Sequence, residues 1–592
     1  MKNKILHIIL LVALSGAWPA FSQSVLYNEG NLVVNSGTNV NIQGSYLNEG
    51  SGSISLAGVI QLTGDWTNNA THNIIASPGT TGEVIFDGSS TQTIGGSDST
   101  FDFSKLTINN GAIVNVTAGY AVTAHGASTF NSPLVLETTT GFRPQTATFI
   151  DNGTVTGNIT AQFSYFGTGS STQAAGRTWY LASPISNATS TVFDVAAGNV
   201  TLAWYNISTS AYVKITTNGV SLTPMLGYEL RTASSNIYYF TGPPNTGTFN
   251  SPGITGPSGQ GGYYLIGNPY PSVLDWNLAT KTNIYGTMWY RTMNLSNKMV
   301  YDTWNGSVGT DNNETAYVDG KVPPMQCFWV RVGPGVTGTV TFDNTMRTNN
   351  WGTAPFLKDG EVQNFDAFRI AVFSWNGSKD EQIIMHQEGA KDSMDNWDAF
   401  KMFVNDTSIA EIFTLSAEKK RLVIQAVAPD TVDKQFPLGI IIGERGNYKF
   451  VADLSGTQPA YSYFLEDKQM SVMQDLSQNP EYNFSSPVVS DSGKRFVIHV
   501  NYVSTKGAVS SNITSTNTKD IFIYSYNGKI FIKNCEPGST IVVYDVMGRP
   551  VYNGKATSGN EIISSPFMSG IYIVKVIDKG RIVKSQKVPV KL

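Results

Sequence analysis

The segments YNEG at residues 27–30, LNEG at residues 47–50 and TNNA at residues 67–70 recur with a period of twenty residues. In the same register, Gly44-Ser45-Tyr46 is matched by Gly64-Asp65-Trp66. A fixed period of this length is typical of stacked coils, in which each coil buries its apolar face only against its neighbours. We therefore predict a β-solenoid, with chance recurrence in a Gly- and Asn-rich segment as the alternative. The predicted strands include Leu32–Val34, Ser53–Leu56 and Val59–Leu62.

The composition extends this β prediction to the whole chain. Only 14% of the 592 residues are charged, the formal net charge is −4, and glycine is abundant, with 57 residues. These values favour short polar turns between strands over long helices with charged outer faces. We predict an all-β protein of several domains, because the length exceeds that of one domain. No Lys/Arg stripe suggests a nucleic-acid partner or an anionic membrane.

The amino terminus has the pattern of an export signal. Lys2 and Lys4 precede an apolar run over residues 5–17, and the small-residue pattern Ala20-Phe21-Ser22 follows. We predict a signal peptide over residues 1–22 with cleavage near Gln23 and an extracellular destination; a retained membrane anchor is the alternative. No other run of eighteen apolar residues occurs, so we expect no transmembrane segment after cleavage.

Changes in composition divide the rest of the chain. Aromatic residues become dense near residue 160, strand-like runs resume after residue 352, and Ser, Thr and Asn dominate residues 504–518. We predict a solenoid over residues 23–160, an aromatic-rich β domain over 161–352, a β-sandwich over 353–503, a polar linker over 504–518 and a last β domain over 519–592. Asn268-Pro269-Tyr270-Pro271 in the second domain predicts an extended or turn backbone. Two cysteines this far apart, Cys327 and Cys535, are predicted to be free thiols.

The segment that begins at Gly82 has a more specific pattern. Its sequence is GEVIFDGSSTQTIGGSDSTFDFSKLTINN. It resembles the β-solenoid stalk segments of large surface proteins from Bacteroidetes that use type IX secretion. The segments WYLASPIS (179–186) and DNWDAFKMF (395–403) likewise resemble domains that accompany such stalks. The stalk pattern is matched by Val84, Phe86, Gln92, Ile94, Phe101, Leu106 and Asn109.

The carboxyl-terminal segment contains two motifs in order. An apolar strand ends in YDVMGRPV (544–551), and GIYIVKV (570–576) follows before a short basic end. The segment resembles the type A C-terminal sorting domain of type IX secretion substrates, although Tyr526-Asn527-Gly528-Lys529 replaces the usual Asn-Pro opening. An ordinary seven-strand immunoglobulin-like sandwich is the alternative. The residues on the sorting motif are Tyr544, Asp545, Gly548, Arg549, Gly570, Tyr572 and Lys575.

The resemblance implies a route and partners for this chain. It implies that the secretion machinery of the outer membrane recognises an immunoglobulin-like tail and that a sortase-like peptidase removes it. The mature protein would then be anchored at the cell surface or released. The three-residue O-glycosylation sequon of such bacteria, which is short enough to occur often by chance, is matched at three places. The candidate sugar-carrying residues are Ser99, Ser393 and Thr431.

The aromatic-rich domain offers candidates for a glycan platform, because sugars stack on Trp and Tyr rings. The alternative is that these rings fill a β-sandwich core. The candidate residues are Trp276, Trp289, Tyr290, Tyr301 and Trp304.

Signals of catalysis are missing from the sequence. The five histidines are scattered, without the spacing of a zinc site, and neither a Walker loop nor a G-x-S-x-G elbow occurs. The acidic doublet Asp380-Glu381 and the run Asp311-Asn312-Asn313-Glu314 are predicted as a solvated turn and a solvated loop. We therefore predict no catalytic residues, no metal and no cofactor. The expected function is that of a non-enzymatic structural or adhesin-like surface protein, with a glycan-binding protein second and a surface glycoside hydrolase third.

Overall fold

The computed structural model describes residues 24–70, 81–109, 111–141, 144–167, 178–259, 261–350, 366–404, 406–429, 432–458, 460–502, 521–526 and 528–590. The predicted signal peptide, the predicted linker and Thr431 lie outside these residues. The chain divides into two compact units, residues 1–293, 297–309 and 315–361 in the first, and residues 294–296, 310–314 and 362–592 in the second. Both units are built from strands, which confirms the predicted all-β fold. Among the described residues, no helix has the length and apolar character needed to cross a membrane.

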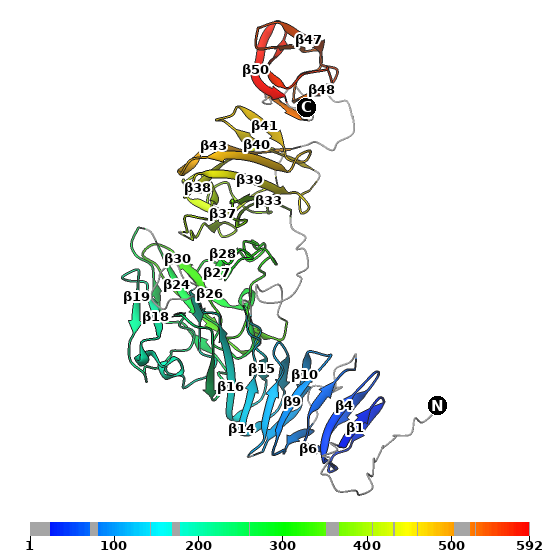
Figure 1. Cartoon of the computed structure of the whole chain (residues 1–592), viewed down its shortest axis with the longest axis vertical. Coiled ribbons are helices and arrows are strands. Elements are labelled where there is room, and N and C mark those ends of the chain that lie inside the picture. The colour runs from blue at the N-terminus through cyan, green and yellow to red at the C-terminus, as the bar shows by residue number, and fades with distance from the viewer. Residues whose placement is uncertain are drawn as a thin grey trace. The chain divides into compact units, whose positions relative to one another are not determined.

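The first unit begins with the predicted solenoid. Its short strands pair in parallel with the equivalent strand of the next coil, so that Tyr27 lies opposite Leu47 and Leu47 opposite Thr67 (Figure 1). The twenty-residue repeat is thereby confirmed as coil stacking. The strands are β1 (Ser24–Asn28), β2 (Asn31–Val34), β3 (Asn39–Ile42), β4 (Gly44–Asn48), β5 (Ser53–Leu56), β6 (Val59–Leu62), β7 (Trp66–Asn68), β8 (Glu83–Phe86), β9 (Thr91–Gly96), β10 (Thr100–Phe103), β11 (Lys105–Ile108), β12 (Ile113–Val116), β13 (Ala121–Ala124), β14 (Ser128–Leu136), β15 (Thr148–Asp151) and β16 (Val155–Tyr165).

Alternation within each short strand builds the solenoid core. In β6 and β8, for example, every second side chain is buried and its neighbours are partly exposed, as a period of two requires. The inward side chains form one continuous cluster along the stack, from Val34 in the first coil through Phe86 and Leu106 to Ile159. The later coils stack on β14, a nine-residue strand that pairs with β11, β12 and β16, and β16 is the last strand of the stack.

A ladder of asparagines runs through this core at the repeat position. Asn28, Asn48 and Asn68 are buried. The Asn28 Nδ2 donates to Asn48 Oδ1 at 2.8 Å, and the Asn48 Nδ2 donates to Asn68 Oδ1 at 2.9 Å. The Asn68 Nδ2 continues the chain to the Asp98 carboxylate at 3.2 Å. Each amide therefore satisfies its neighbour one coil away, which a buried polar group requires.

The solenoid passes into the aromatic-rich region through a shared strand. Strand β16 pairs in parallel with β14 and antiparallel with β21 (Asn236–Gly242) of that region. The expected boundary between residues 160 and 161 therefore falls inside β16, and one apolar cluster continues from the coils to Phe240. The other elements of the first unit are β17 (Trp179–Leu181), η1 (Ser190–Phe193), η2 (Val195–Ala197), β18 (Val200–Asn206), β19 (Ala211–Ile215), β20 (Tyr228–Thr232), β22 (Phe249–Asn250), β23 (Ile254–Thr255), β24 (Gly262–Gly267), β25 (Val273–Asp275), η3 (Trp276–Leu278), β26 (Thr280–Thr282), β27 (Met288–Met293), β28 (Met299–Trp304), β29 (Lys321–Val322), β30 (Cys327–Val332), β31 (Thr337–Phe342), η4 (Asn344–Met346) and β32 (Arg347–Thr348).

The second unit begins with one eleven-stranded sheet. Its two ends fold over one core, because Phe368 of β33 stacks on Tyr463 of β40 with ring centroids 4.5 Å apart. This geometry is the predicted β-sandwich. The strands are β33 (Ala367–Phe373), β34 (Lys379–His386), β35 (Ala399–Phe400), β36 (Glu411–Leu415), β37 (Arg421–Val427), β38 (Lys434–Ile442), β39 (Gly446–Asp453), β40 (Tyr461–Asp467), β41 (Val472–Asp475), β42 (Glu481–Ser486) and β43 (Val489–Tyr502).

The carboxyl-terminal residues form a smaller sandwich. Two sheets, of strand order β44-β45-β48 and β47-β46-β49-β50, enclose a common apolar core that includes Ile532, Val543 and Val574. The seven strands are β44 (Phe522–Tyr526), β45 (Lys529–Lys533), β46 (Thr540–Tyr544), β47 (Pro550–Lys555), β48 (Asn560–Ile563), β49 (Gly570–Asp578) and β50 (Arg581–Val590).

The asparagine ladder predicts the effect of interrupting it. Replacing Asn48→Ala removes one acceptor of the Asn28 amide and one donor to the Asn68 carbonyl in a buried site. We expect a loss of about 1–3 kcal/mol of local stability, measured as faster hydrogen exchange of the backbone amides in β4 and β7. The matched control is Asn41→Ala, an exposed position of β3. Equal exchange in both variants would contradict a structural role of the ladder.

Candidate functional site

The turn between β46 and β47 carries the first half of the predicted sorting motif. The Asp545 carboxylate accepts the backbone N–H groups of Met547 at 2.9 Å and of Arg549 at 3.0 Å, and the Arg549 Nε donates to it at 2.8 Å. These donors hold the pKa of Asp545 below its usual value, with the Arg549 N–H the largest contribution. Gly548 has φ 76°, a left-handed conformation that glycine adopts without strain. The motif residues therefore fix the shape of the hairpin.

The second half of the motif lies on β49, directly beside β46. Tyr544 pairs with Ile573, and the Lys575 Nζ lies 5.1 Å from the centre of the Tyr544 ring. Gly570 begins β49, and the Tyr572 hydroxyl donates to the Met568 carbonyl at 3.0 Å. The fold thus brings together two motifs that are separated in sequence.

Large apolar side chains are exposed on this hairpin, on β49 and just before β49. Val546, Met547 and Met568 are 69%, 77% and 77% exposed, and Ile571 and Ile573 are also exposed on β49. Exposed apolar side chains on neighbouring elements are typical of a surface that contacts a partner.

The five aromatic candidates for a glycan platform occupy a different environment. Trp276, Trp289, Tyr290 and Trp304 are at most 4% exposed, and Tyr301 is partly buried. Their polar atoms are used internally, because the Trp276 Nε1 donates to the Gly286 carbonyl at 2.7 Å and the Trp304 Nε1 to Asn277 at 2.9 Å. These rings fill the core of the aromatic-rich domain, so they form no exposed platform for a sugar.

Of the sequon residues, Ser99 and Ser393 are exposed, and Thr431 lies outside the described residues. In the described part of the chain, no group of three or more His, Cys, Asp or Glu side chains is placed to hold a metal ion. Cys327 and Cys535 are free and buried.

The acidic doublet predicted to be a solvated turn is buried, and the acidic run predicted to be a solvated loop is buried in part. Asp380 and Glu381 lie in strand β34 and are 3% and 4% exposed, because Lys401 and Arg369 provide buried cationic partners. Asn312 and Asn313 are also buried. The solvated-turn prediction is therefore wrong, and in the loop of residues 311–314 only Asp311 and Glu314 are partly exposed. The apolar run that follows the doublet predicts a strand, and in the structure this strand, β34, already begins at Lys379, so that it includes Asp380 and Glu381.

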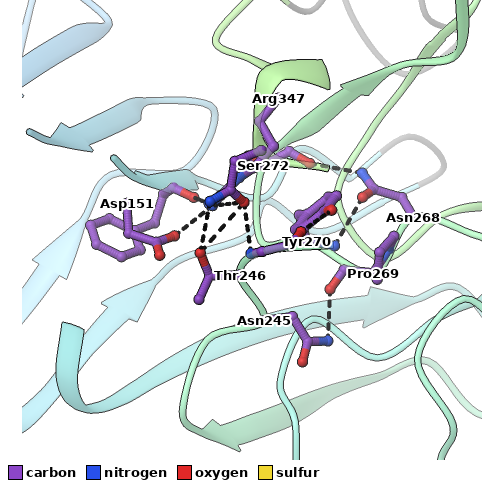
Figure 2. A network of polar contacts seen from close by, with 11 residues as sticks. Asp151, Asn245, Thr246, Asn268, Pro269, Tyr270, Ser272 and Arg347 are labelled. Atoms are coloured by element: carbon purple, nitrogen blue, oxygen red, sulfur yellow. Dashed lines mark hydrogen bonds and ion pairs between the residues drawn. The ribbon is translucent and has the colours of Figure 1, made fainter. Parts of the chain in front are cut away.

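A buried ion pair ties the last solenoid coil to the aromatic-rich domain of the same unit (Figure 2). The Arg347 Nη1 lies 2.6 Å from Asp151 Oδ1, and both side chains are fully buried. Arg347 also donates from Nη2 to the Phe149 carbonyl at 2.9 Å and from Nε to the Ser272 hydroxyl at 3.1 Å. Its guanidinium carbon lies 5.1 Å from the centre of the Tyr270 ring. One arginine, the first residue of β32, thus contacts both β15 and the Asn-Pro-Tyr-Pro segment.

The Asn-Pro-Tyr-Pro segment has the turn geometry that its prolines predict. The Asn268 Oδ1 accepts the Tyr270 N–H at 3.0 Å, and the Asn268 Nδ2 donates to the carbonyls of Ser272, Val322 and Pro323. From the neighbouring loop, the Asn245 Nδ2 donates to the Pro269 carbonyl at 2.8 Å (Figure 2). The Phe149 N–H of the solenoid donates to the Pro271 carbonyl at 2.7 Å. We call this network, with Asp151 and Arg347, the coil-end joint.

One carboxyl group has a pKa near neutrality. Burial raises the pKa of Asp398 to about 7, although the N–H groups of Asp395 and Ala426 donate to it at 3.0 and 2.9 Å. Such a pKa suits a general acid or base, but only when the group faces a substrate. The cavity of about 1050 Å³ in the second unit is lined by other residues, among them Tyr448, Phe484 and Arg495. Asp398 is therefore assigned a structural role.

The raised pKa of Asp398 predicts a pH dependence of stability. Because the folded-state value of about 7 exceeds the ordinary value of 3.8, the protonated group contributes stability that is lost as the pH rises from about 4 to about 7. We expect Asp398→Asn to weaken the fall in urea-unfolding stability of the second unit over this range. The control is Glu388→Gln, an exposed carboxyl. The same pH slope in wild type and Asp398→Asn would contradict the assignment.

The coil-end joint predicts a large cost for removing one charge. Arg347→Met leaves Asp151 buried without a cation, which costs about 3–5 kcal/mol. The double variant Arg347→Met/Asp151→Leu removes both charges and should recover part of that loss in thermal unfolding. Lys214→Met, at an exposed position, serves as the control. An Arg347→Met protein as stable as the control would show that the pair is dispensable.

Comparisons with known proteins supply a family but no activity. No curated protein matches the chain. Among solved structures, a chain described as "Biofilm associated protein - BSP domain" is aligned over 74% of this chain and 93% of that one, at 9% identity and a TM-score of 0.14, a likeness too weak to carry an argument. The family model described as "Domain of unknown function (DUF8693)" matches residues 58–500. That match spans the solenoid from its second coil, the coil-end joint and the larger sandwich, and the chain belongs to the DUF8693 family.

Proposed function

We propose that this chain is a non-enzymatic, exported protein with a structural or adhesin-like role at the cell surface or in the medium, and that residues 519–592 direct its export. The observation that carries the proposal is the convergence of the two tail motifs on neighbouring strands β46 and β49. Tyr544 and Lys575 are in contact there, and the hairpin shaped by Asp545 and Gly548 stands beside them.

The surface chemistry of the tail supports a recognition role. A signal read on a folded domain must be presented on its outside, and Arg549 at the hairpin is 77% exposed. Val546 and Met547 lie beside it with their apolar side chains in solvent. An isolated sandwich gains nothing from exposing such residues, whereas a partner that buries them gains binding energy. The proposed partners are the type IX secretion machinery and a sortase-like peptidase that removes the tail.

The remainder of the chain has the character of a scaffold. The solenoid builds length from repeated short strands, and the asparagines buried at its repeat position satisfy one another from coil to coil. The buried histidine His499 pairs with Glu466 and lies in a strand of the sandwich. We assign these groups to stability, and we propose no reaction for them.

The alternative roles receive less support. A glycan-binding role was suggested by aromatic residues that lie in the core, and a glycoside hydrolase role would need a carboxylate pair facing a cleft. Neither idea has a specific observation in its favour, so we propose only the structural or adhesin-like role.

The export proposal is tested by shortening the chain in its native host. A protein that ends at Thr518 should accumulate in the periplasm and be lost from washed cells and medium, because the recognition surface is gone. The full chain with Glu536→Gln, an exposed change on the tail away from the motifs, should be exported normally. Mass spectrometry of the surface form should map its start near Gln23 and its end shortly before Lys519. Normal surface display of the truncated protein would refute the proposal.

A further inference from the structure

Lys401 and Asp380 form a buried ion pair inside the larger sandwich. Asp380 is the second residue of strand β34, and Lys401 directly follows β35. The Lys401 Nζ contacts Asp380 Oδ1, and the side chains are only 3% and 5% exposed. Lysine is almost never buried to this extent in proteins unless it is paired with an opposite charge.

The degree of burial separates this pair from the other lysine–carboxylate pairs of the described residues. Lys321–Asp275 and Lys379–Asp311 each keep between 13% and 17% of both side chains exposed, and Lys449–Glu481 is at the surface. Water can solvate the charges of those pairs. Water has little access to the charges of Lys401 and Asp380. Burial raises the pKa of Asp380, although the positive charge of the lysine beside it lowers this pKa. A proton transfer from the ammonium to the carboxylate, which leaves two neutral groups, becomes less unfavourable as the surroundings become less polar.

Two further donors hold the Asp380 carboxyl in a fixed orientation. The Ile412 backbone N–H donates to Oδ2 at 2.7 Å, and the Asn312 Nδ2 donates to Oδ1 at 3.3 Å. Asn312 is itself fixed, because its Oδ1 accepts the Glu381 N–H at 2.8 Å. The carbonyl oxygen of a reacting acid therefore has a backbone N–H directed at it, which is the arrangement that stabilises a tetrahedral oxyanion.

From this geometry we propose that Lys401 and Asp380 condense to an intramolecular amide bond, a covalent cross-link within the sandwich. The proton first moves from the Lys401 ammonium to the Asp380 carboxylate. The neutral Nζ then attacks Cγ, and the charge that develops on Oδ2 is held by the Ile412 N–H. The Cγ–Oδ1 bond breaks, and Oδ1 takes a proton from the nitrogen and leaves as water. One N–C bond forms and one C–O bond breaks, with no change in oxidation state.

Proximity makes this condensation feasible in water. Two groups held in contact in one orientation reach effective concentrations of about 10⁵–10⁸ M, which offsets the unfavourable equilibrium of amide formation between separate molecules. The product would bind β34 to the segment after β35. It would supply a covalent tie in a chain whose two cysteines, Cys327 and Cys535, are both free.

The test is mass spectrometry of the purified, folded full chain. After proteolysis, we expect a branched peptide that joins the segments around Asp380 and Lys401, lighter than the sum of the two linear peptides by the mass of one water molecule. The intact protein should be lighter by the same amount than the mass calculated from its mapped termini. Linear peptides of full mass from folded protein would overturn the proposal and leave a plain ion pair.

Variants test the role of each group. Lys401→Arg keeps a cation but cannot form the amide, so the branched peptide should be lost and the intact mass should equal the calculated one. Lys379→Arg, in the more exposed pair with Asp311, should leave the cross-link in place. Asn312→Ala should lower the fraction of cross-linked protein at a fixed time after synthesis. A branched peptide in Lys401→Arg would place the bond elsewhere and refute the assignment, and should the variants not fold, the wild-type masses alone decide.

Discussion

Hydrogen bonding between successive solenoid coils is the constraint on which the first unit depends. A strand of four or five residues such as β1 or β4 cannot bury its backbone alone, and it satisfies its N–H and C=O groups on the next coil. The asparagine ladder adds a condition on register, because Asn48 must face both Asn28 and Asn68 at once. A slip of one residue would turn the amide out of the core and its apolar neighbours into water. The ladder therefore specifies the alignment that the apolar side chains stabilise.

The same constraint explains the coil-end joint. A stack of coils ends in unpaired strand edges unless another element covers them. Strand β16 extends the last coil far enough to pair with β21, so the aromatic-rich domain continues the sheet. Asp151 then becomes buried at the end of β15, and Arg347 supplies its counter-charge from much later in the chain. The ion pair makes the covering of the stack specific, since no other register of β32 would bring the guanidinium to Asp151.

The parts of this fold that could be predicted from sequence are those that repeat or alternate locally. The twenty-residue period placed Tyr27, Leu47 and Thr67 in register, and the hairpin glycines predicted a seven-strand tail. The pairing of Asp151 with Arg347 could not be predicted, because it depends on tertiary contacts between distant segments. The rings of Trp276 and Trp289 could not be assigned to core or surface from composition, since aromatic residues occur both in β-sandwich cores and on exposed binding surfaces. The burial of Asp380-Glu381 could not be predicted, because acidic residues usually lie in solvent and nothing in the sequence identifies Lys401 and Arg369 as their partners.

The buried carboxylates of Asp380 and Glu381 show how the sandwich differs from a purely apolar core. Asp380 and Glu381 point to opposite faces of β34, as alternation requires, and each meets its own cation. Asn312 bridges the two by accepting the Glu381 N–H and donating to Asp380. Replacing such a network by apolar residues of similar volume often costs no stability, whereas removing one member leaves a buried charge unpaired. We therefore infer that the network specifies which segments pack beside β34. This fixed packing places the Lys401 amine against the Asp380 carboxyl group in a buried site.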